Sequence, residues 1–165
     1  MIQLHPYQAT DIESIRAWFR KRVRCVLWYM PTGAGKSYAS GFMFLSAASA
    51  GKICWFIVHR RELIRQTERL FKSLGIDFAI VAAGYPMQPH KKVQICSIGS
   101  LARRFDKLPK PDFACFDEVH HVAAATWTDI FKRLGDSFIV GLSASPARCD
   151  GRGLGPYFGA LVATT

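Results

Sequence analysis

The chain has 165 residues, of which 50% are hydrophobic, and this is enough apolar surface for one well-buried domain. It has neither an apolar run near the roughly 18 residues of a membrane span nor a charged-then-apolar leader, so we expect neither a membrane protein nor a secreted one. The five cysteines are widely spaced without a C-x-x-C pair, which predicts reduced thiols in a cytoplasmic protein and no zinc site. The net charge of +10 favours a polyanionic partner, although many proteins are basic for solubility alone.

The first predicted element is a helix over residues 6–22. Its apolar residues recur at helical spacing: Ile12, Ile15, Trp18 and Phe19. Thr10 followed by Glu13 matches a capping-box pattern, in which the two side chains satisfy free N–H groups at a helix start. The basic residues at its far end suit a helix C-terminus, and a contact with nucleic acid is the alternative for them.

A glycine-rich loop follows the apolar run 25–29, which we predict to be a strand, and precedes an apolar segment predicted to be a helix. This strand, loop and helix are the context of a phosphate-binding loop. Gly33 and Gly35 allow consecutive backbone N–H groups to turn inward, and the helix N-terminus adds partial positive charge. Lys36 can then reach the β- and γ-phosphates, and the Ser37 hydroxyl can ligate Mg²⁺. The predicted phosphate-binding residues are Thr32, Gly33, Ala34, Gly35, Lys36 and Ser37.

Two observations leave an alternative open for this loop. The strict pattern G-x-x-x-x-G-K-[ST] has glycine where this chain has Met30, so only its second half is met. A glycine-rich turn that binds nothing is the other interpretation.

Strands and helices alternate along the rest of the chain. We predict strands over residues 53–58, 76–81, 93–96, 113–116 and 138–142, the last clear strand, and helices over 61–74 and around 127–134. The uninterrupted apolar run 53–58 is typical of a strand covered on both faces. The sequence therefore predicts an α/β fold with a mainly parallel sheet and helices on both faces. Ligands bind beyond the carboxyl ends of such strands, where the polar clusters of this chain stand.

Asp117 and Glu118 follow the predicted strand 113–116 directly. A carboxylate at a strand end can hold Mg²⁺ directly or through water, and a second carboxylate can orient an attacking water. We assign Asp117, together with Ser37, to Mg²⁺ and Glu118 to the water. A solvated acidic pair would be the better interpretation if the phosphate-binding loop were absent.

In their order, these motifs resemble the first RecA-like domain of superfamily 2 helicases, in the DExH group. The matching segments are residues 31–37 (motif I), 59–63 (motif Ia), 97–101 (motif Ib), 117–120 (motif II, as D-E-V-H) and 143–146 (motif III). Residues 5–8 resemble the adenine-contacting segment of this family. Residues 60–66 and the glycine-rich tail after Arg148 are most similar to the subgroup of type III restriction subunits and bacterial or phage repair helicases, which implies a bacterial or phage-encoded protein.

The resemblance implies a P-loop NTPase domain that uses ATP and Mg²⁺. In it Gln8 would read the adenine edge, and three residues would couple the nucleotide state to the grip on nucleic acid: His120, Ser143 and Ser145. Backbone phosphates of a nucleic acid, with DNA favoured over RNA, would contact five residues: Arg60, Arg61, Ser97, Ser100 and Arg103. Gln8 could instead be a polar residue at a helix start, and Ser97 and Ser100 could be turn or cap residues. Four aromatic residues fit the core better than base stacking: Trp55, Phe56, Trp127 and Phe131.

The resemblance implies that residues 1–165 correspond to the first helicase domain alone. Complete enzymes of the resembled family have a second RecA-like domain, with an arginine finger that is worth about 10³–10⁵ in rate where NTPases use one. We therefore expect this second domain in the same or another chain, and little turnover and no unwinding by this chain alone. The predicted function is the ATP-binding domain of a nucleic-acid helicase or translocase. The alternative is a non-catalytic nucleic-acid-binding or regulatory module. A P-loop kinase or GTPase is disfavoured by the absence of an N-K-x-D segment and by the presence of Ser-Ala-Ser-Pro at residues 143–146.

Overall fold

The computed structural model describes residues 3–119, 124–145 and 157–165. The strands in these ranges form one sheet, in which every pair is parallel, in the order β3-β4-β2-β5-β6-β1-β7. The strands are β1 (Cys25–Tyr29), β2 (Cys54–Val58), β3 (Phe78–Val81), β4 (Val93–Ser97), β5 (Phe113–Phe116), β6 (Phe138–Ser143) and β7 (Ala160–Ala163). The helices are α1 (Pro6–Arg20), α2 (Lys36–Ser49), α3 (Arg61–Ser73), α4 (Ile98–Arg104) and α5 (Ala124–Leu134), with a 3₁₀ turn η1 (Phe105–Lys107). The predicted α/β fold is confirmed.

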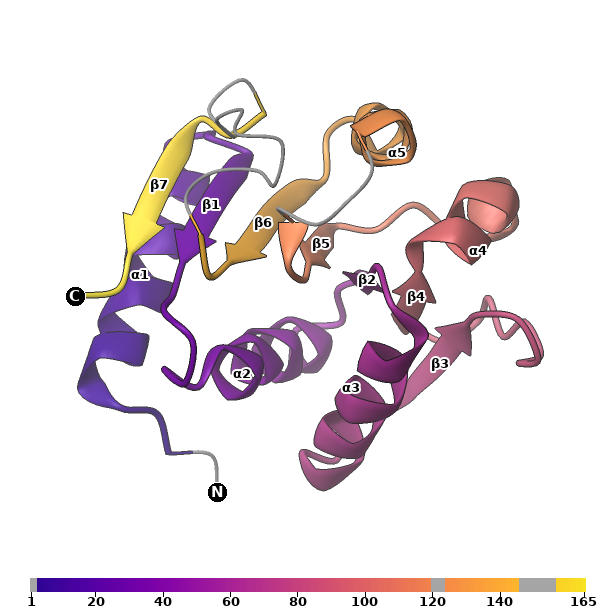
Figure 1. Ribbon diagram of the computed structural model, residues 1–165, viewed down its shortest axis with the longest axis horizontal. Helices are drawn as coiled ribbons and strands as arrows, with labels where there is room; N and C mark the ends of the chain where they lie inside the picture. The colour runs from indigo at the N-terminus through magenta and orange to yellow at the C-terminus, as the bar shows by residue number, and fades with distance from the viewer. Residues whose placement is uncertain (1–2, 120–123, 146–156) are drawn as a thin grey trace.

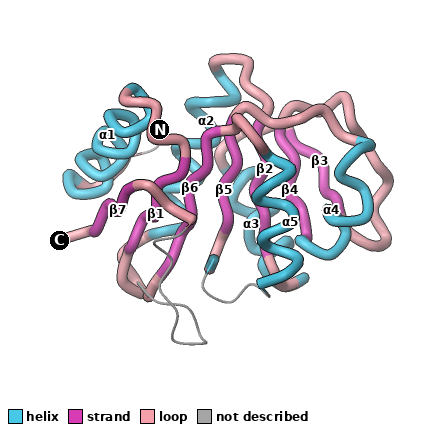
Figure 2. The backbone as a smooth tube through the Cα atoms, turned by 90° about the horizontal axis from the view of Figure 1, so that it is seen from above, coloured by secondary structure: helices cyan, strands magenta, loops and turns pink. Residues whose placement is uncertain are grey.

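Helices cover both faces of the sheet, with α2 and α3 on one side and α4 and α5 on the other (Figure 1). Seen from above, the strands lie side by side in sheet order (Figure 2). Phe56 of β2 packs into the core under α1, α2 and α3, whereas its neighbours Trp55 and Ile57 pack into the core under α4 and α5. Because successive strand residues point to opposite faces, a strand covered on both sides is apolar throughout, as residues 54–58 are.

The buried carboxylate of Asp11 ties α1 to the sheet. Its Oδ2 accepts hydrogen bonds from Trp28 Nε1 of β1 at 3.0 Å and from Thr164 Oγ1, just after β7, at 2.6 Å. A buried carboxylate that accepts two hydrogen bonds is well satisfied. This contact fixes α1 over the edge of the sheet where β1 and β7 lie.

Strand β7 is absent from the sequence prediction, which had residues 138–142 as the last clear strand. It pairs in parallel with β1, so that Leu27 lies beside Leu161. It is an edge strand of four residues, and the side chain of Leu161 is 54% exposed. Its residues, Ala-Leu-Val-Ala, are all apolar, but they come directly after the glycine-rich tail and were not separated from it in the sequence.

The start of α1 at residue 6 is as predicted, but its cap is not. The helix begins at Pro6, so Thr10 lies inside it and its hydroxyl donates to the Pro6 carbonyl at 3.0 Å. The capping box predicted for Thr10 and Glu13 is wrong, because proline supplies the helical φ at the first position and starts the helix a turn earlier. Gln8 takes the capping role at the actual start, where its Oε1 accepts from the His5 N–H at 3.0 Å.

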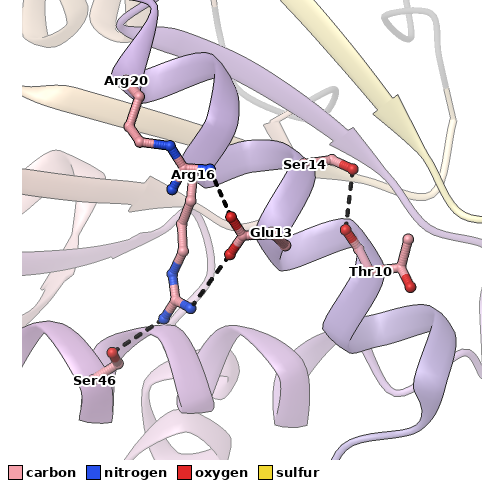
Figure 3. A network of polar contacts seen from close by, with 6 residues as sticks. All are labelled: Thr10, Glu13, Ser14, Arg16, Arg20 and Ser46. Atoms are coloured by element: carbon pink, nitrogen blue, oxygen red, sulfur yellow. Dashed lines mark hydrogen bonds and ion pairs between the residues drawn. The ribbon is translucent and has the colours of Figure 1, made fainter.

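Glu13 instead pairs with arginines on the surface of α1 (Figure 3). Its carboxylate lies 2.6 Å from Arg20 and 4.0 Å from Arg16, and the hydrogen bond from Arg20 lowers the pKa of Glu13. Arg16 also donates to Ser46 Oγ of α2 at 3.1 Å. These groups are exposed, so they orient α1 against α2 more than they stabilise the fold.

No helix in the described ranges is both long and apolar enough to cross a membrane.

Candidate nucleotide-binding site

The phosphate-binding loop lies between β1 and α2, as predicted. Gly33 has a φ of 86° and Gly35 a φ of 75°, and Gly35 is the N-cap of α2. This left-handed conformation costs little only for glycine, so the two glycines allow the backbone to turn into the N-terminus of α2. Met30 is fully buried, and its N–H donates to the Ser143 carbonyl at 2.9 Å. The residue that departs from the general pattern is therefore a core residue that joins the end of β1 to the end of β6.

Two residues of α1 hold the loop through its carbonyl groups. Gln8 Nε2 donates to Ala34 O at 3.0 Å and to Gly35 O at 3.4 Å, and Tyr7 Oη donates to Ala34 O at 3.0 Å. Gln8 is 1% exposed, and its amide oxygen already caps α1. Its side chain therefore positions the phosphate-binding loop in this structure, and its contact with adenine stays a prediction.

Lys36 and Asp117 meet across the site. Lys36 Nζ lies 3.8 Å from Asp117 Oδ1, and the two side chains are 17% and 11% exposed. The Asp117 N–H donates to Ile57 O at 2.9 Å, which extends the pairing of β5 with β2 by one residue. Burial raises the pKa of Asp117, Lys36 opposes this, and Glu118 adds to it. The Asp117 carboxylate is thus largely shielded from water, and the positive charge of Lys36 compensates its negative charge only in part.

The geometry of Asp117 fits a bound cation. Its Oδ1 is buried and accepts no hydrogen bond from any residue in the described ranges. Those ranges also hold no group of three or more His, Cys, Asp or Glu residues that could enclose a metal. Mg²⁺ commonly takes only one or two protein ligands and completes its shell with water and substrate phosphates. The Ser37 hydroxyl and the Asp117 carboxylate supply such a partial set.

A cleft of about 600 Å³ opens over these residues. Its volume is in the range of about 300–1,000 Å³ that small-molecule sites occupy. The phosphate-binding loop and the two carboxylates line one part, and α3 lines another. The lining residues are Pro31, Thr32, Gly33, Gly35, Lys36, Ser37, Tyr38, Phe56, Gln66, Thr67, Leu70, Asp117, Glu118 and Ala144.

Glu118 stands in an unusual backbone conformation, with a φ of 47°. Its Oε2 lies 3.7 Å from His59 Nε2, and the side chains are 33% and 10% exposed. His59 follows β2 as Glu118 follows β5, and these strands are neighbours in the sheet. His59 is the first residue of the predicted motif Ia, but no individual role was predicted for it. Only the pairing of β2 with β5, which the sequence does not display, brings the two side chains together.

The predicted coupling residues are described in part. His120 lies outside the described residues, as does Pro146 of motif III. Ser143 is fully buried at the end of β6, where its Oγ accepts from the Ser145 N–H at 3.0 Å and donates to the Ser145 carbonyl. Since the Ser143 carbonyl also binds Met30, this turn is joined directly to the chain that enters the phosphate-binding loop.

The predicted nucleic-acid contacts divide into exposed arginines and buried or capping serines. Arg60 and Arg103 are exposed, and Arg61 is exposed with its Nη2 donating to Ala83 O at 2.9 Å. Ser97 is the N-cap of α4, whose Oγ accepts from the Ser100 N–H at 3.3 Å, and Ser100 is 3% exposed. The capping role of Ser97 is confirmed, while phosphate contacts by all five residues stay predictions.

Three of the four aromatic residues expected in the core are buried there, and Phe131 is half-buried against it. Trp55, Phe56 and Trp127 are 0%, 2% and 4% exposed, and Phe131 stacks on Trp127 with ring centroids 4.7 Å apart. Buried rings cannot stack on bases without unfolding the face they cover. They stabilise the two cores on either side of the sheet.

A parallel sheet with a phosphate-binding loop after β1 and an Asp-Glu pair after β5 is the arrangement of a RecA-like P-loop NTPase domain. Residues 1–148 match the family model described as "Type III restriction enzyme, res subunit". The chain belongs to this family.

Proteins with curated sequences resemble the chain along most of its length. It is 32% identical over 123 residues to a 51.5 kDa protein of a Lactococcus phage, which covers 74% of this chain and 25% of that protein. It is 30% identical over 154 residues to the DNA 3'-5' translocase XPB2 of Sulfurisphaera tokodaii, which covers 92% of this chain and 33% of the translocase. The chain therefore spans a third or less of these relatives.

Solved structures share the fold. The structure of T4 UvsW superposes with a TM-score of 0.78 at 19% identity over 99% of this chain and 35% of that one. The type ISP restriction-modification enzyme LlaGI, in complex with a DNA substrate mimic, gives a TM-score of 0.75 at 17% identity over 99% of this chain and 20% of that one. These likenesses show a common helicase-type fold.

Proposed function

We propose that this chain is the ATP-binding domain of a DNA helicase or translocase, and that Mg-ATP binds in the cleft between the phosphate-binding loop and the carboxylates after β5. The observation that carries the proposal is the placement of Lys36 Nζ 3.8 Å from the buried Asp117 Oδ1, which accepts no hydrogen bond within the described ranges. A phosphate with its cation between these groups would satisfy both charges at once.

Each residue of the site has a distinct task in this proposal. The backbone N–H groups of residues 33–37 and the N-terminus of α2 bind the phosphates, and Lys36 neutralises their charge. Ser37 and Asp117 would hold Mg²⁺, which when bound neutralises charge that develops on the phosphates. Glu118, which is one third exposed beside Asp117, would accept a proton from the attacking water and orient it. Gln8 would favour adenine over guanine.

Two observations support DNA as the partner. The relative from Sulfurisphaera is named as a DNA translocase, and the LlaGI structure holds a DNA substrate mimic. The chain is basic, and its exposed arginines follow β2 at the same edge as the site.

The cleft is open on one side, so we propose that a second RecA-like domain closes it and that the isolated chain hydrolyses ATP slowly. We also propose that it acts in the bacterial cytoplasm, as its phage relative suggests.

Equilibrium binding of a fluorescent ATP analogue, with and without Mg²⁺, tests the proposal. We expect binding by the parent chain, loss of at least about tenfold in affinity for Lys36→Ala, and near-parental affinity for Glu118→Gln, because Glu118 acts on water rather than on phosphate. His90→Ala, in an exposed loop, is the matched control. Equal affinity of the parent and Lys36→Ala would refute the proposal and favour a module that binds nucleic acid without nucleotide.

A further inference from the structure

The loops after β2 and β5 place a histidine against the proposed water-orienting carboxylate. Ile57 of β2 pairs with Phe116 of β5, and the Asp117 N–H continues the ladder to Ile57 O at 2.9 Å. His59, directly after β2, and Glu118, the second residue after β5, therefore leave the sheet at the same edge. Their side-chain atoms Nε2 and Oε2 are 3.7 Å apart.

The contact is partly shielded from water but is not a tight hydrogen bond. The His59 side chain is 10% exposed and that of Glu118 is 33% exposed, so the contact lies at the border of the cleft. A separation of 3.7 Å exceeds the range of N–H···O bonds, and such a contact can be exchanged for another at small cost. It restrains Glu118 without locking it.

The backbone of Glu118 is suited to a change of position. Glu118 and Arg22 are the two non-glycine residues in the described ranges with positive φ, at 47° and 66°. A glutamate keeps this conformation only where surrounding contacts hold it, and such residues cluster at switch regions. In this chain one of those contacts is His59.

His59 is also continuous with the segment proposed to contact DNA. Arg60 is the N-cap of α3 and Arg61 its first residue, and both are exposed. A backbone phosphate drawn to these arginines would pull on the residue directly before them. Residues 59–61 therefore connect the proposed DNA contacts at Arg60 and Arg61 to the proposed ATP site at Glu118.

We propose that His59 is a positioning residue, which restrains Glu118 while the domain is free of DNA and releases it when DNA engages Arg60 and Arg61. This rests on the proposed function. It assigns His59 the coupling of DNA binding to the carboxylate that orients water, across the β2–β5 pair.

Carbon-13 NMR of the Glu118 side-chain carboxyl group tests the inference without requiring turnover. A short synthetic DNA duplex should shift this resonance in the parent chain, because its proposed contacts at Arg60 and Arg61 adjoin His59. In His59→Ala the resonance should already lie at the DNA-bound position and should not respond to the duplex. His59→Gln, which keeps a polar N–H group near the carboxylate, should restore the response, and His90→Ala should behave as the parent.

Three outcomes would overturn the inference: a duplex that binds without moving the Glu118 resonance, a response that persists in His59→Ala, or no binding of the duplex at all. Nucleotide binding by the parent and its loss in Lys36→Ala are measured separately. The coupling can therefore fail while the proposed function stands. If Lys36→Ala binds nucleotide as the parent does, it is the proposed function that fails.

Discussion

Lys36 at the start of α2 and Asp117 after β5 place their charged atoms 3.8 Å apart, each on a side chain that is less than one fifth exposed. The attraction between them does not compensate the burial of the carboxylate, because the pKa of Asp117 is raised and desolvation is the largest cause. The site is therefore built for a ligand that brings additional positive charge to Asp117 and negative charge to Lys36. Stability is given up for binding at this position.

Asp117→Asn should raise the melting temperature of the nucleotide-free chain. A carboxyl group with a raised native pKa favours folding in its protonated form, so its contribution to stability is lost as the pH rises through that pKa. Asparagine resembles the protonated form at every pH and avoids this loss. Thermal unfolding at neutral pH measures the change, and Asp136→Asn on the exposed surface is the control. A lower melting temperature for Asp117→Asn would contradict the dominance of desolvation.

The same substitution should remove most of the stabilisation that Mg-ATP provides. At about 100 times its Kd a ligand stabilises the native state by about 2.7 kcal/mol, which corresponds to about 5–10 °C for a chain of this length. The parent should show this shift, and Asp117→Asn should show a small fraction of it. Equal shifts in both proteins would mean that Asp117 does not hold the cation.

Gly35→Ala should be more destabilising than Gly33→Ala, although both glycines have positive φ. A Cβ at Gly33 would meet open space, whereas one at Gly35 would lie 2.6 Å from Gln8 Nε2. The backbone conformation alone costs about 1–2 kcal/mol for alanine, so we expect that loss for Gly33→Ala and a further loss for Gly35→Ala. Urea unfolding measures both.

Gln8→Ala in the background of Gly35→Ala should recover the additional loss, because it removes the side chain that the new methyl group meets. The double-mutant cycle isolates this contact from the backbone cost. Additive effects of the two substitutions would show that Gln8 does not constrain the loop.

Arg60→Ala and Arg61→Ala should each weaken DNA binding and reduce its salt dependence. Each phosphate contact that is lost lowers the slope of log K against log salt by about 0.9 on duplex DNA. Fluorescence anisotropy over a salt series measures the slope, and Arg69→Ala, an exposed arginine further along α3, should leave it unchanged. An equal decrease for all three variants would indicate a diffuse basic surface rather than contacts after β2.

Cys96→Ala should reduce the alkaline loss of stability. Burial raises the pKa of the thiols of Cys54, to about 12, and of Cys96, further still, so the native state keeps these protons while the unfolded chain loses them near its ordinary pKa of 9.0. The contribution of each protonated thiol to the free energy of unfolding is therefore fully present below pH 9.0 and declines above it. Each such thiol steepens the decline by about 1.4 kcal/mol per pH unit. Urea titrations at several pH values above 9.0 give the slope of the free energy of unfolding against pH. This slope should be smaller by that amount in Cys96→Ala, and identical slopes would contradict the burial of the Cys96 thiol.

Local patterns in the sequence determined much of the fold and the outline of the site. The apolar run of β2 predicted a strand covered on both faces, because each of its residues meets one of two cores. Gly33, Gly35, Lys36 and Ser37 stand within a few residues of one another, so the loop they form depends on the backbone there and could be read directly. Asp117 and Glu118 directly follow the apolar strand β5, so this pair could also be identified from a local pattern.

The tertiary structure alone decided which distant groups meet. The order of strands, which places β2 beside β5, brought His59 to Glu118, and the packing of α1 brought Gln8 to the carbonyl of Ala34. It also added β7 beside β1, an edge strand that comes directly after the glycine-rich tail. Periodicity and turn residues act over one element, whereas pairing between strands is set by the free energy of the whole sheet and its two cores. Which side chains meet at the site therefore follows from packing.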